Sequence, residues 1–318
     1  MNRLIIAVIL ISIALPAQAN DSAVETAAGG LRLRKEDSVL MEKERLLISK
    51  RIVRVEYDFR NTTNETVVSE VAFPIPPFKY VFDDMSRDFA DFKAWIDDKP
   101  IKVQKEVRGL VKGRDVTEEL LKARISIETF GGYDVSTATD QITALKPDMR
   151  KRLVNLGIVK EHKQKGKVIE YSPSWEVSIK YHWQQEFPPG KVVHIKHEYV
   201  PVAGYTQVQL QGFKKRITDS CIDATTFNEV KNRVAKAMRK QPLGNNYLSA
   251  GWVSYILTTA NTWQTPIRDF EMIVQAEKDE VASLCWDGPL EKVGESKLRA
   301  RKQDFVPKKD IKAYFFNF

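Results

Sequence analysis

The sequence predicts a mainly β fold, a β-rich α+β protein built as an antiparallel β-sandwich with a helical insert and a C-terminal β unit. Residues 52–59 and 175–199 alternate apolar and polar side chains, as half-buried antiparallel strands do. Between them, residues 115–163 change to a helical period with helix start and stop signals. The 318 residues are 43% hydrophobic and 29% charged, which is typical of a globular protein with one large or two ordinary domains.

The N-terminus has the features of a cleavable signal peptide, residues 1–19. A positive start precedes the apolar run 4–15, Pro16 ends that run, and Ala19 provides a small residue for cleavage. The run is shorter than the roughly 20 residues of a membrane-spanning helix, and no later segment approaches that length. Asn20 follows the cleavage point, where a lipoprotein would have cysteine. We expect a periplasmic or secreted protein with no transmembrane segment in the mature chain.

The next strands are expected to form hairpins. Residues 52–59 are expected to pair with 67–73 across the turn cluster at 61–64. A second hairpin is expected from residues 89–95 and 101–107, which flank an Asp-Asp-Lys-Pro turn.

The insert at about residues 115–163 is expected to be helical. Thr117 precedes two glutamates and two leucines, as at a capped helix start. Pro147 is placed to begin a second helix and Gly157 to end it.

The strand after the insert is expected to return on itself within residues 175–200. Pairing Lys180 with Glu198 is favourable, whereas a shift of two residues places Lys180 opposite Lys196. The favoured register leaves a three-residue loop that ends at Gly190.

The chain beyond residue 210 is expected to begin with an amphipathic helix over residues 227–238. Further strands are expected at residues 255–259, 270–274, 281–284 and 312–318. We therefore divide the mature chain into a β-sandwich domain, residues 20–210, and a helix with a C-terminal β unit, residues 211–318.

The formal net charge of +8 is concentrated in short clusters. These clusters lie at residues 150–152, 160–167, 214–216 and 231–240. In an exported protein the expected partner is an anionic envelope polymer, a lipid head group or another envelope protein, and nucleic acid is not expected. The alternative is that these residues are solvated faces that keep the protein soluble.

The two cysteines, Cys221 and Cys285, are expected to form one disulfide because an exported chain folds in an oxidising compartment. The alternatives are two free thiols or two ligands of a metal site. No further ligands lie nearby at ligand spacing, so no metal site is predicted.

No motif for a cofactor, a phosphate loop or an activated nucleophile is present, so no cofactor is predicted. His194 and His197 have a metal-like spacing, but residues three apart on a strand point to opposite faces. Glu198, Asp269 and Asp287 are the carboxylates that lie near aromatic residues, and Glu198 and Asp269 are the candidates for general acid–base chemistry; the alternative is that they are surface charges or turn caps. The candidates for ligand binding are Trp263, Tyr255, His182 and His194. Trp263 is the one we expect at a functional surface.

Several motifs resemble a family of exported bacterial proteins known as a domain of unknown function, number 4424. They are Gly29-Gly30-Leu31, Leu47-Ile48-Ser49, Ala72-Phe73-Pro74, Phe187-Pro188, His197-Glu198-Tyr199, Asn261, Trp263, Pro266-Ile267, Cys285, Asp287-Gly288 and Phe305-Val306-Pro307. The resemblance covers nearly the whole mature chain and implies no catalytic residues. Residues 53–76 also resemble, over a short stretch, the β-sandwich start of vault and inter-alpha-trypsin inhibitor modules.

Three hypotheses for function remain. The first is a non-enzymatic binding or assembly protein of the cell envelope, based on the basic clusters and the absence of catalytic motifs. The second is a periplasmic glycan hydrolase that uses Glu198 or Asp269. The third is a small-ligand carrier with a cleft lined by Trp263 and Tyr255.

Overall fold

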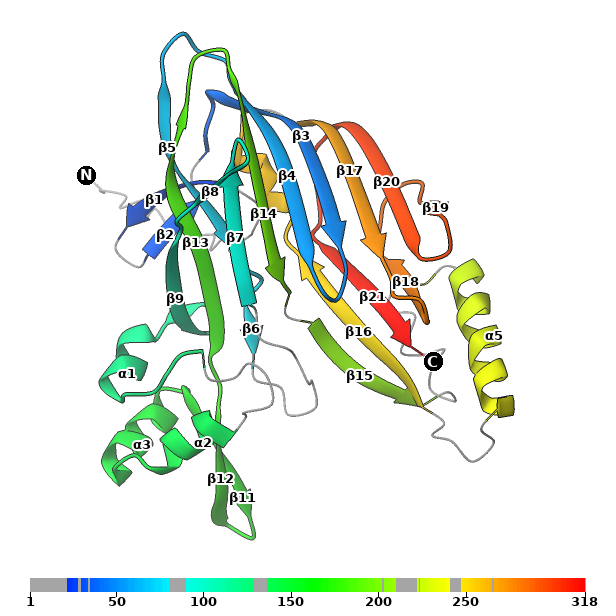
Figure 1. The fold of residues 1–318 in the computed structure, drawn as a ribbon. Helices are drawn as coiled ribbons and strands as arrows, with labels where there is room; N and C mark the ends of the chain where they lie inside the picture. The colour runs from blue at the N-terminus through cyan, green and yellow to red at the C-terminus, as the bar shows by residue number, and fades with distance from the viewer. Residues whose placement is uncertain are drawn as a thin grey trace, which may run out of the picture.

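The computed structural model describes residues 22–27, 30–33, 35–79, 90–128, 136–201, 203–209, 222, 224–240, 247–264 and 266–317. The predicted signal peptide lies outside these residues. The predicted β-rich fold is confirmed: several sheets, almost wholly antiparallel, are accompanied by a few helices (Figure 1).

The largest sheet has eight strands in the order β19-β20-β17-β3-β4-β14-β7-β8. Its strands are β3 (Val39–Ile48), β4 (Val53–Asn61), β7 (Ala90–Ile96), β8 (Lys99–Ile101), β14 (Val192–Val200), β17 (Ile267–Gln275), β19 (Glu291–Val293) and β20 (Lys297–Phe305). β3 and β17 run parallel, and the other neighbours run antiparallel.

Two smaller sheets lie against one face of this large sheet. The seven-stranded sheet contains β1 (Ser22–Ala27), β2 (Gly30–Leu33), β5 (Val67–Pro74), β6 (Phe78–Lys79), β9 (Gln104–Val111), β10 (Arg114–Asp115) and β13 (Glu176–Phe187). The four-stranded sheet contains β15 (Ala203–Gln209), β16 (Tyr247–Tyr255), β18 (Glu280–Leu284) and β21 (Ile311–Asn317).

The three sheets share one aromatic core. Phe73 of β5 lies 4.7 Å from the ring of His197 on β14 and 6.4 Å from Tyr255 of β16, measured between ring centroids. Tyr255 also meets Tyr57 of β4 through their hydroxyl groups, 3.0 Å apart. Full burial of each large side chain contributes about 1.5–3 kcal/mol, so this junction is a main source of stability.

Two of the predicted hairpins are wrong. β4 and β5 lie in different sheets, and so do β13 and β14, so the register that pairs Lys180 with Glu198 does not form. Both connections are arches that carry the chain from one layer of the sandwich to the other (Figure 1). Alternating apolar residues show only that one side of a strand is buried. The two strands of an arch have this pattern just as the two strands of a hairpin do, so the pattern does not identify the strand partner.

Asn61 holds the two arches together. Its side-chain nitrogen donates to the carbonyl oxygens of Glu65 and Phe187, each at 2.7 Å. The backbone carbonyl oxygen of Asn61 accepts a hydrogen bond from Gly190 N at 3.1 Å. The side chain is fully buried, and its oxygen accepts from Thr63 N at 2.8 Å, so its hydrogen-bonding groups are satisfied.

The predicted hairpin with its turn at Asp97 and Asp98 is confirmed near the turn, where β7 pairs with β8. Both residues have positive φ, 48° and 63°, as a two-residue hairpin turn requires, and they join β7 to β8. The sequence pattern predicts a return strand that runs on to residue 107. Instead β8 ends at Ile101, and β9 leaves for the seven-stranded sheet.

The helical insert is confirmed. It contains α1 (Thr117–Lys122), α2 (Ser136–Thr143) and α3 (Pro147–Asn155). Pro147 is the first residue of α3, and Gly157, with φ of 71°, follows its end. A two-stranded hairpin, β11 (Val159–Gln164) and β12 (Lys167–Pro173), follows the helices.

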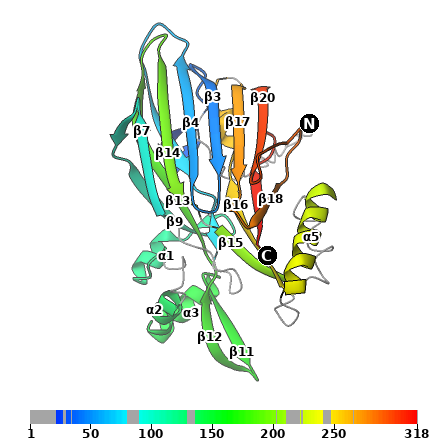
Figure 2. The ribbon, with the colours of Figure 1, turned by 45° about the vertical axis from the view of Figure 1, so that its right-hand side comes forward.

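The predicted C-terminal helix is present as α5 (Ala224–Lys240), and its Val230 packs with Ala250, Val281 and Phe316 of the four-stranded sheet. Figure 2 shows α5 beside β18. The strand predicted at 255–259 is wrong, because Tyr255 ends β16 and Thr258–Thr262 form a 3-10 helix. The other three C-terminal strands are present as β17, β18 and β21. The division near residue 210 stays a prediction.

Candidate functional site

Tyr255 and Trp263 lie in the core. Tyr255 is 1% exposed and donates a hydrogen bond from its hydroxyl group to Glu44 Oε1 at 3.2 Å. Burial, followed by the nearby Tyr57 and Glu44, raises the pKa of Tyr255 well above its ordinary value. Trp263 is also 1% exposed and lies against Phe59, with ring centroids 4.5 Å apart. The expected surface position of Trp263 is therefore wrong, because its loop turns the indole inward.

The two candidate histidines lie in different sheets, each beside a carboxylate. His182 Nδ1 lies 2.6 Å from Glu70 Oε1 in the seven-stranded sheet. His194 Nδ1 lies 2.9 Å from Asp58 Oδ1 in the eight-stranded sheet. They therefore do not form one site.

His194 borders a shallow hollow on the outer face of the eight-stranded sheet. The other residues around it are Lys43, Arg45, Glu56 and Asp58. Partial burial acts to raise the pKa of Asp58, but hydrogen bonds from Lys43 and His194 outweigh burial and hold it below its ordinary value. Charges of opposite sign alternate across this face, so the hollow is largely neutralised from within.

The two candidate carboxylates are also neutralised by basic neighbours. Glu198 accepts from Arg54 Nε at 2.6 Å and lies 3.2 Å from Lys196 Nζ. Partial burial opposes ionisation, but these hydrogen bonds lower the pKa of Glu198. Asp269 is ion-paired with Arg45 and accepts from Gln303 at 3.1 Å.

The geometry of Glu198 and Asp269 does not suit glycoside hydrolysis. Asp269 is on β17, three strands away from β14 in the sheet. The strand pairings place His194 of β14 level with Asp269, and Glu198 lies four residues further along β14. At ~4.8 Å per strand and ~3.3 Å per residue, the two lie roughly 20 Å apart. Paired glycosidase carboxylates lie about 5–10 Å apart, and the acid has a raised pKa.

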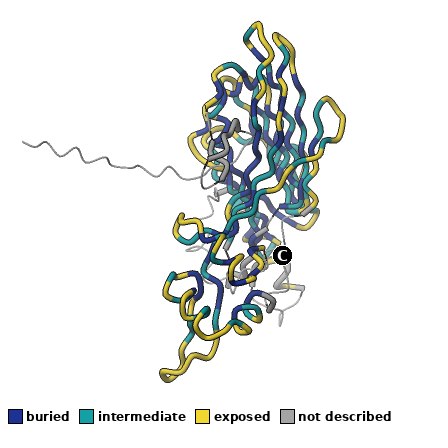
Figure 3. The backbone as a smooth tube through the Cα atoms, turned by 90° about the vertical axis from the view of Figure 1, so that its left-hand side faces the viewer, coloured by how far each residue is buried: buried dark blue, intermediate teal, exposed yellow. Residues whose placement is uncertain are grey.

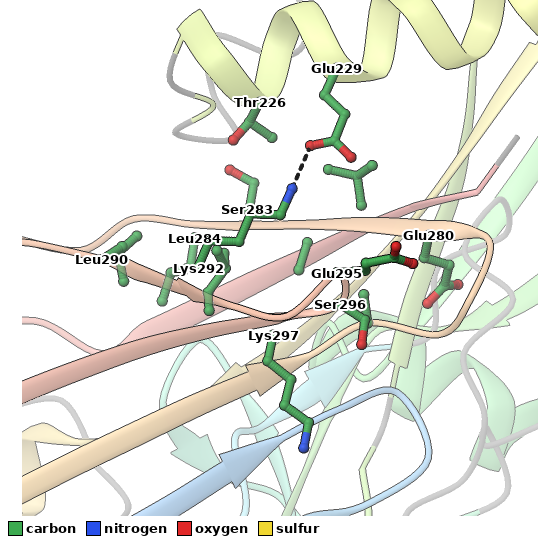
Figure 4. Close-up of a pocket in the computed structure, with 14 residues that line it drawn as sticks. Thr226, Glu229, Glu280, Ser283, Leu284, Leu290, Lys292, Glu295, Ser296 and Lys297 are labelled. Carbon is green, nitrogen blue, oxygen red and sulfur yellow. Dashed lines mark hydrogen bonds and ion pairs between the residues drawn. The ribbon is translucent and has the colours of Figure 1, made fainter.

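A cavity of about 330 Å³ lies between α5, β18 and the β19–β20 hairpin (Figure 4). Glu229 of α5 and Lys292 of the hairpin meet across it at 3.2 Å. Partial burial acts to raise the pKa of Glu229, but hydrogen bonds from Lys292 and Arg233 lower it. Glu280 lines the cavity and is ion-paired with Lys50. The remaining lining includes apolar Leu284 and polar Ser283, so it can contact a small polar molecule.

The sequence patterns did not predict this cavity. Its lining comes from four separate elements, and its charged residues occur singly in the sequence. The only local signal was the amphipathic helix, which predicted that α5 packs on a sheet.

Positive charge gathers on a part of the molecule that we call the basic projection, residues 136–173. It comprises α2, α3, β11 and β12, and it extends below the sheets in Figure 1. It contains eight Lys or Arg and four Asp or Glu, a net charge of +4 out of +8 for the whole chain. Lys151 and Arg152 of α3 are exposed, as are Lys160 and Lys163 of β11.

Among the described residues, no three His, Cys, Asp or Glu side chains converge as a metal site would require. Nor does any helix in the described part of the chain have the length and apolar character needed to cross a membrane. Cys221 lies outside the described residues, so its pairing with Cys285 stays a prediction.

These features define a multi-sheet β protein with a basic projection and a small polar cavity. The chain belongs to the family DUF4424, a domain of unknown function, whose family model matches residues 19–313. The family resemblance seen in the sequence is thereby confirmed. No curated protein sequence matches the chain.

Two solved structures are similar over much of the chain. A candidate nutrient-binding protein from Legionella pneumophila has 16% identity and a TM-score of 0.43, over 88% of this chain and 68% of that protein. A two-domain M1 zinc metallopeptidase variant with bound L-tryptophan has 7% identity and a TM-score of 0.26, over 88% of this chain and 44% of that protein. Likenesses this distant carry no functional conclusion.

Proposed function

We propose that the protein is an exported, non-enzymatic binding or assembly protein of the cell envelope, with an anionic partner. The observation that carries this proposal is the concentration of half the net charge in the basic projection. A local excess of positive charge attracts anions over about 10 Å at moderate salt. In the periplasm or outside the cell, where the signal peptide directs the chain, such partners are anionic polymers and lipid head groups.

The state of Glu198 and Asp269 supports a binding role over hydrolysis. Each carboxylate is held by basic neighbours. A general acid must instead keep its proton near neutral pH, which needs a raised pKa. The lowered pKa of Glu198 is the opposite of that requirement.

Binding of the mature chain to isolated anionic envelope material tests the proposal. Lys151→Gln with Arg152→Gln should weaken binding and reduce its salt dependence, because two exposed charges of the projection are lost. Lys278→Gln with Lys308→Gln removes the same charge from exposed positions outside the projection, and should leave binding unchanged. Equal losses in both variants, or no binding at low salt, would contradict the proposal.

The cavity beside α5 favours a second candidate function, carriage of a small polar ligand. Its volume of about 330 Å³ is enough for a molecule of amino-acid or monosaccharide size. Equilibrium dialysis with radiolabelled amino acids and sugars tests this. Leu290→Trp narrows the cavity and should abolish binding, while Leu121→Trp, at an exposed position on α1, should not.

Export and the disulfide have direct tests. N-terminal sequencing of the protein from a bacterial periplasm should begin at Asn20. Thiol titration of the unfolded protein should find no free thiol before reduction and two after it, if Cys221 and Cys285 are joined. Two thiols before reduction would contradict the pairing.

A further inference from the structure

The hairpin of β11 and β12 forms the far end of the basic projection, and most residues around its turn are exposed (Figure 1). The two strands pair only with each other among the described strands, and they extend from the helices at the lower end of the molecule (Figure 1). Figure 3 shows that end of the chain as a largely exposed loop of backbone. A two-stranded sheet has little stability of its own, so something must fix this one in place.

The base of the hairpin is held by contacts between its two strands, between the residues that flank them, and with α3. His162 Nε2 lies 2.7 Å from Ser172 Oγ, and Ser172 is buried. The guanidinium of Arg150 on α3 lies over the ring of Tyr171, 4.9 Å from its centroid. Ser174 N donates to the carbonyl oxygen of Ile158 at 2.9 Å. The tip is therefore held out from the body on an anchored stem.

The tip combines positive charge with exposed aliphatic side chains. Residues 163–169 contain three lysines and no acidic residue. They end with Val168, which is 38% exposed, and Ile169, which is 62% exposed. Ile169 occupies a bulge in the pairing, because Lys163 pairs with Val168 while the residue before Lys163 pairs with Glu170.

We infer that this tip, residues 163–169, docks on the surface of a bilayer that contains anionic phospholipids. Lysines attract the phosphates, while Val168 and Ile169 enter the boundary between head groups and acyl chains. A hydrophilic polymer would satisfy the lysines but would offer no apolar phase to the aliphatic pair. The inference rests on the proposed function, since it names the anionic partner as a lipid surface.

The tip remains positive even though two acidic residues lie near it. Lys163 is ion-paired with Glu161 at 2.9 Å, on the same strand. Glu170 lies just beyond Ile169 and is exposed. Lys165 and Lys167 flank the turn at Gly166, farther from both carboxylates along the hairpin. The hairpin therefore has its positive end at the point that extends farthest.

Sedimentation of the mature protein with phospholipid vesicles tests the inference. Wild type should bind vesicles that contain phosphatidylglycerol and should not bind pure phosphatidylcholine. Val168→Ser with Ile169→Ser should weaken binding about 10-fold or more, through the lost apolar contact. Lys165→Gln with Lys167→Gln should weaken it about 30-fold, at roughly tenfold per 1.4 kcal/mol and about 1 kcal/mol per lysine.

Matched controls separate this inference from the broader proposal. Val68→Ser with Val306→Ser removes aliphatic groups that are 56% and 48% exposed elsewhere, and should leave vesicle binding unchanged. The serine pair at the tip should also leave binding to a soluble polyanion such as polyphosphate unchanged.

Two results would overturn the inference. One is unchanged vesicle binding in the tip serine variant, in which case salt-sensitive binding to envelope polymers would still support the proposed function. The other is a wild-type protein that does not bind vesicles containing phosphatidylglycerol, including one that binds an envelope protein through the tip instead.

Discussion

Glu44 illustrates how a single residue can obscure a strand in the sequence. It is fully buried on β3 and accepts a hydrogen bond from Tyr255, which also meets Tyr57. A carboxylate at a core-facing position breaks the apolar alternation that Leu46 and Ile48 continue, so residues 39–48 were not predicted as a strand. Buried polar groups are tolerated when they are hydrogen-bonded, and these hydroxyl groups provide the bonds.

Replacing Tyr255 by phenylalanine should destabilise the fold. The ring remains, but Glu44 and Tyr57 each lose a partner inside the core, which costs about 1–3 kcal/mol of the free energy of unfolding. Urea denaturation at pH 7 measures the change. Tyr314→Phe, at a partly exposed ring, is the control and should change stability by less than about 0.5 kcal/mol. Equal effects in the two variants would contradict a structural role for the buried network.

The lowered pKa values of Asp58 and Glu198 predict acid sensitivity. A carboxyl group whose pKa is lower in the folded state stabilises the fold above its unfolded pKa of about 4, and that contribution disappears as pH falls through the lowered value. Asp58→Asn should therefore reduce stability at pH 7 and flatten its decline below about pH 5. Denaturant titrations over this range measure both. Glu186→Gln, at an exposed position, should behave as wild type.

At the scale of elements, local sequence signals predict the ends of a helix correctly, whereas the sequence pattern does not predict which strands pair. Pro147 and Gly157 delimit α3 as predicted, because their conformational limits act within one turn of helix. Strand partners depend on contacts between residues far apart in sequence, so the sequence pattern predicts hairpins where the chain forms two arches. The same limit applies to the candidate sites. His194 was singled out, but Lys43 and Asp58 come from strands that only the fold brings beside it.

The link between the arches predicts a large effect at Asn61. Asn61→Ala removes the donors to two carbonyl oxygens and the acceptor for Thr63, and should lower the free energy of unfolding by about 2–4 kcal/mol. Asn64→Ala changes an exposed residue of the same turn and should cost less than about 0.5 kcal/mol. Thermal and urea unfolding compare them. A small effect at Asn61 would mean that the arches are held mainly by the apolar groups beneath them.

At the scale of the whole molecule, the eight-stranded sheet contains strands from both predicted units, residues 20–210 and residues 211–318. β17 from the C-terminal range pairs with β3 from the N-terminal range over six residues, from Asp269–Lys43 to Val274–Ile48. The four-stranded sheet covers the same aromatic core through Tyr255. If either unit were removed, the other would lose strand partners in the eight-stranded sheet and part of the layer that covers the core.

This continuity predicts that the mature protein unfolds in one cooperative transition. Asn61→Ala acts at the arches, and Gly204→Ala acts in the four-stranded sheet, where a Cβ would collide with the ring of Trp252. Because the two sites belong to one core, each substitution should shift the same calorimetric transition, with calorimetric and van't Hoff enthalpies that agree. Two transitions, one moved by each substitution, would instead mean that residues 20–210 and 211–318 fold as separate units, joined by a sheet interface too weak to couple them.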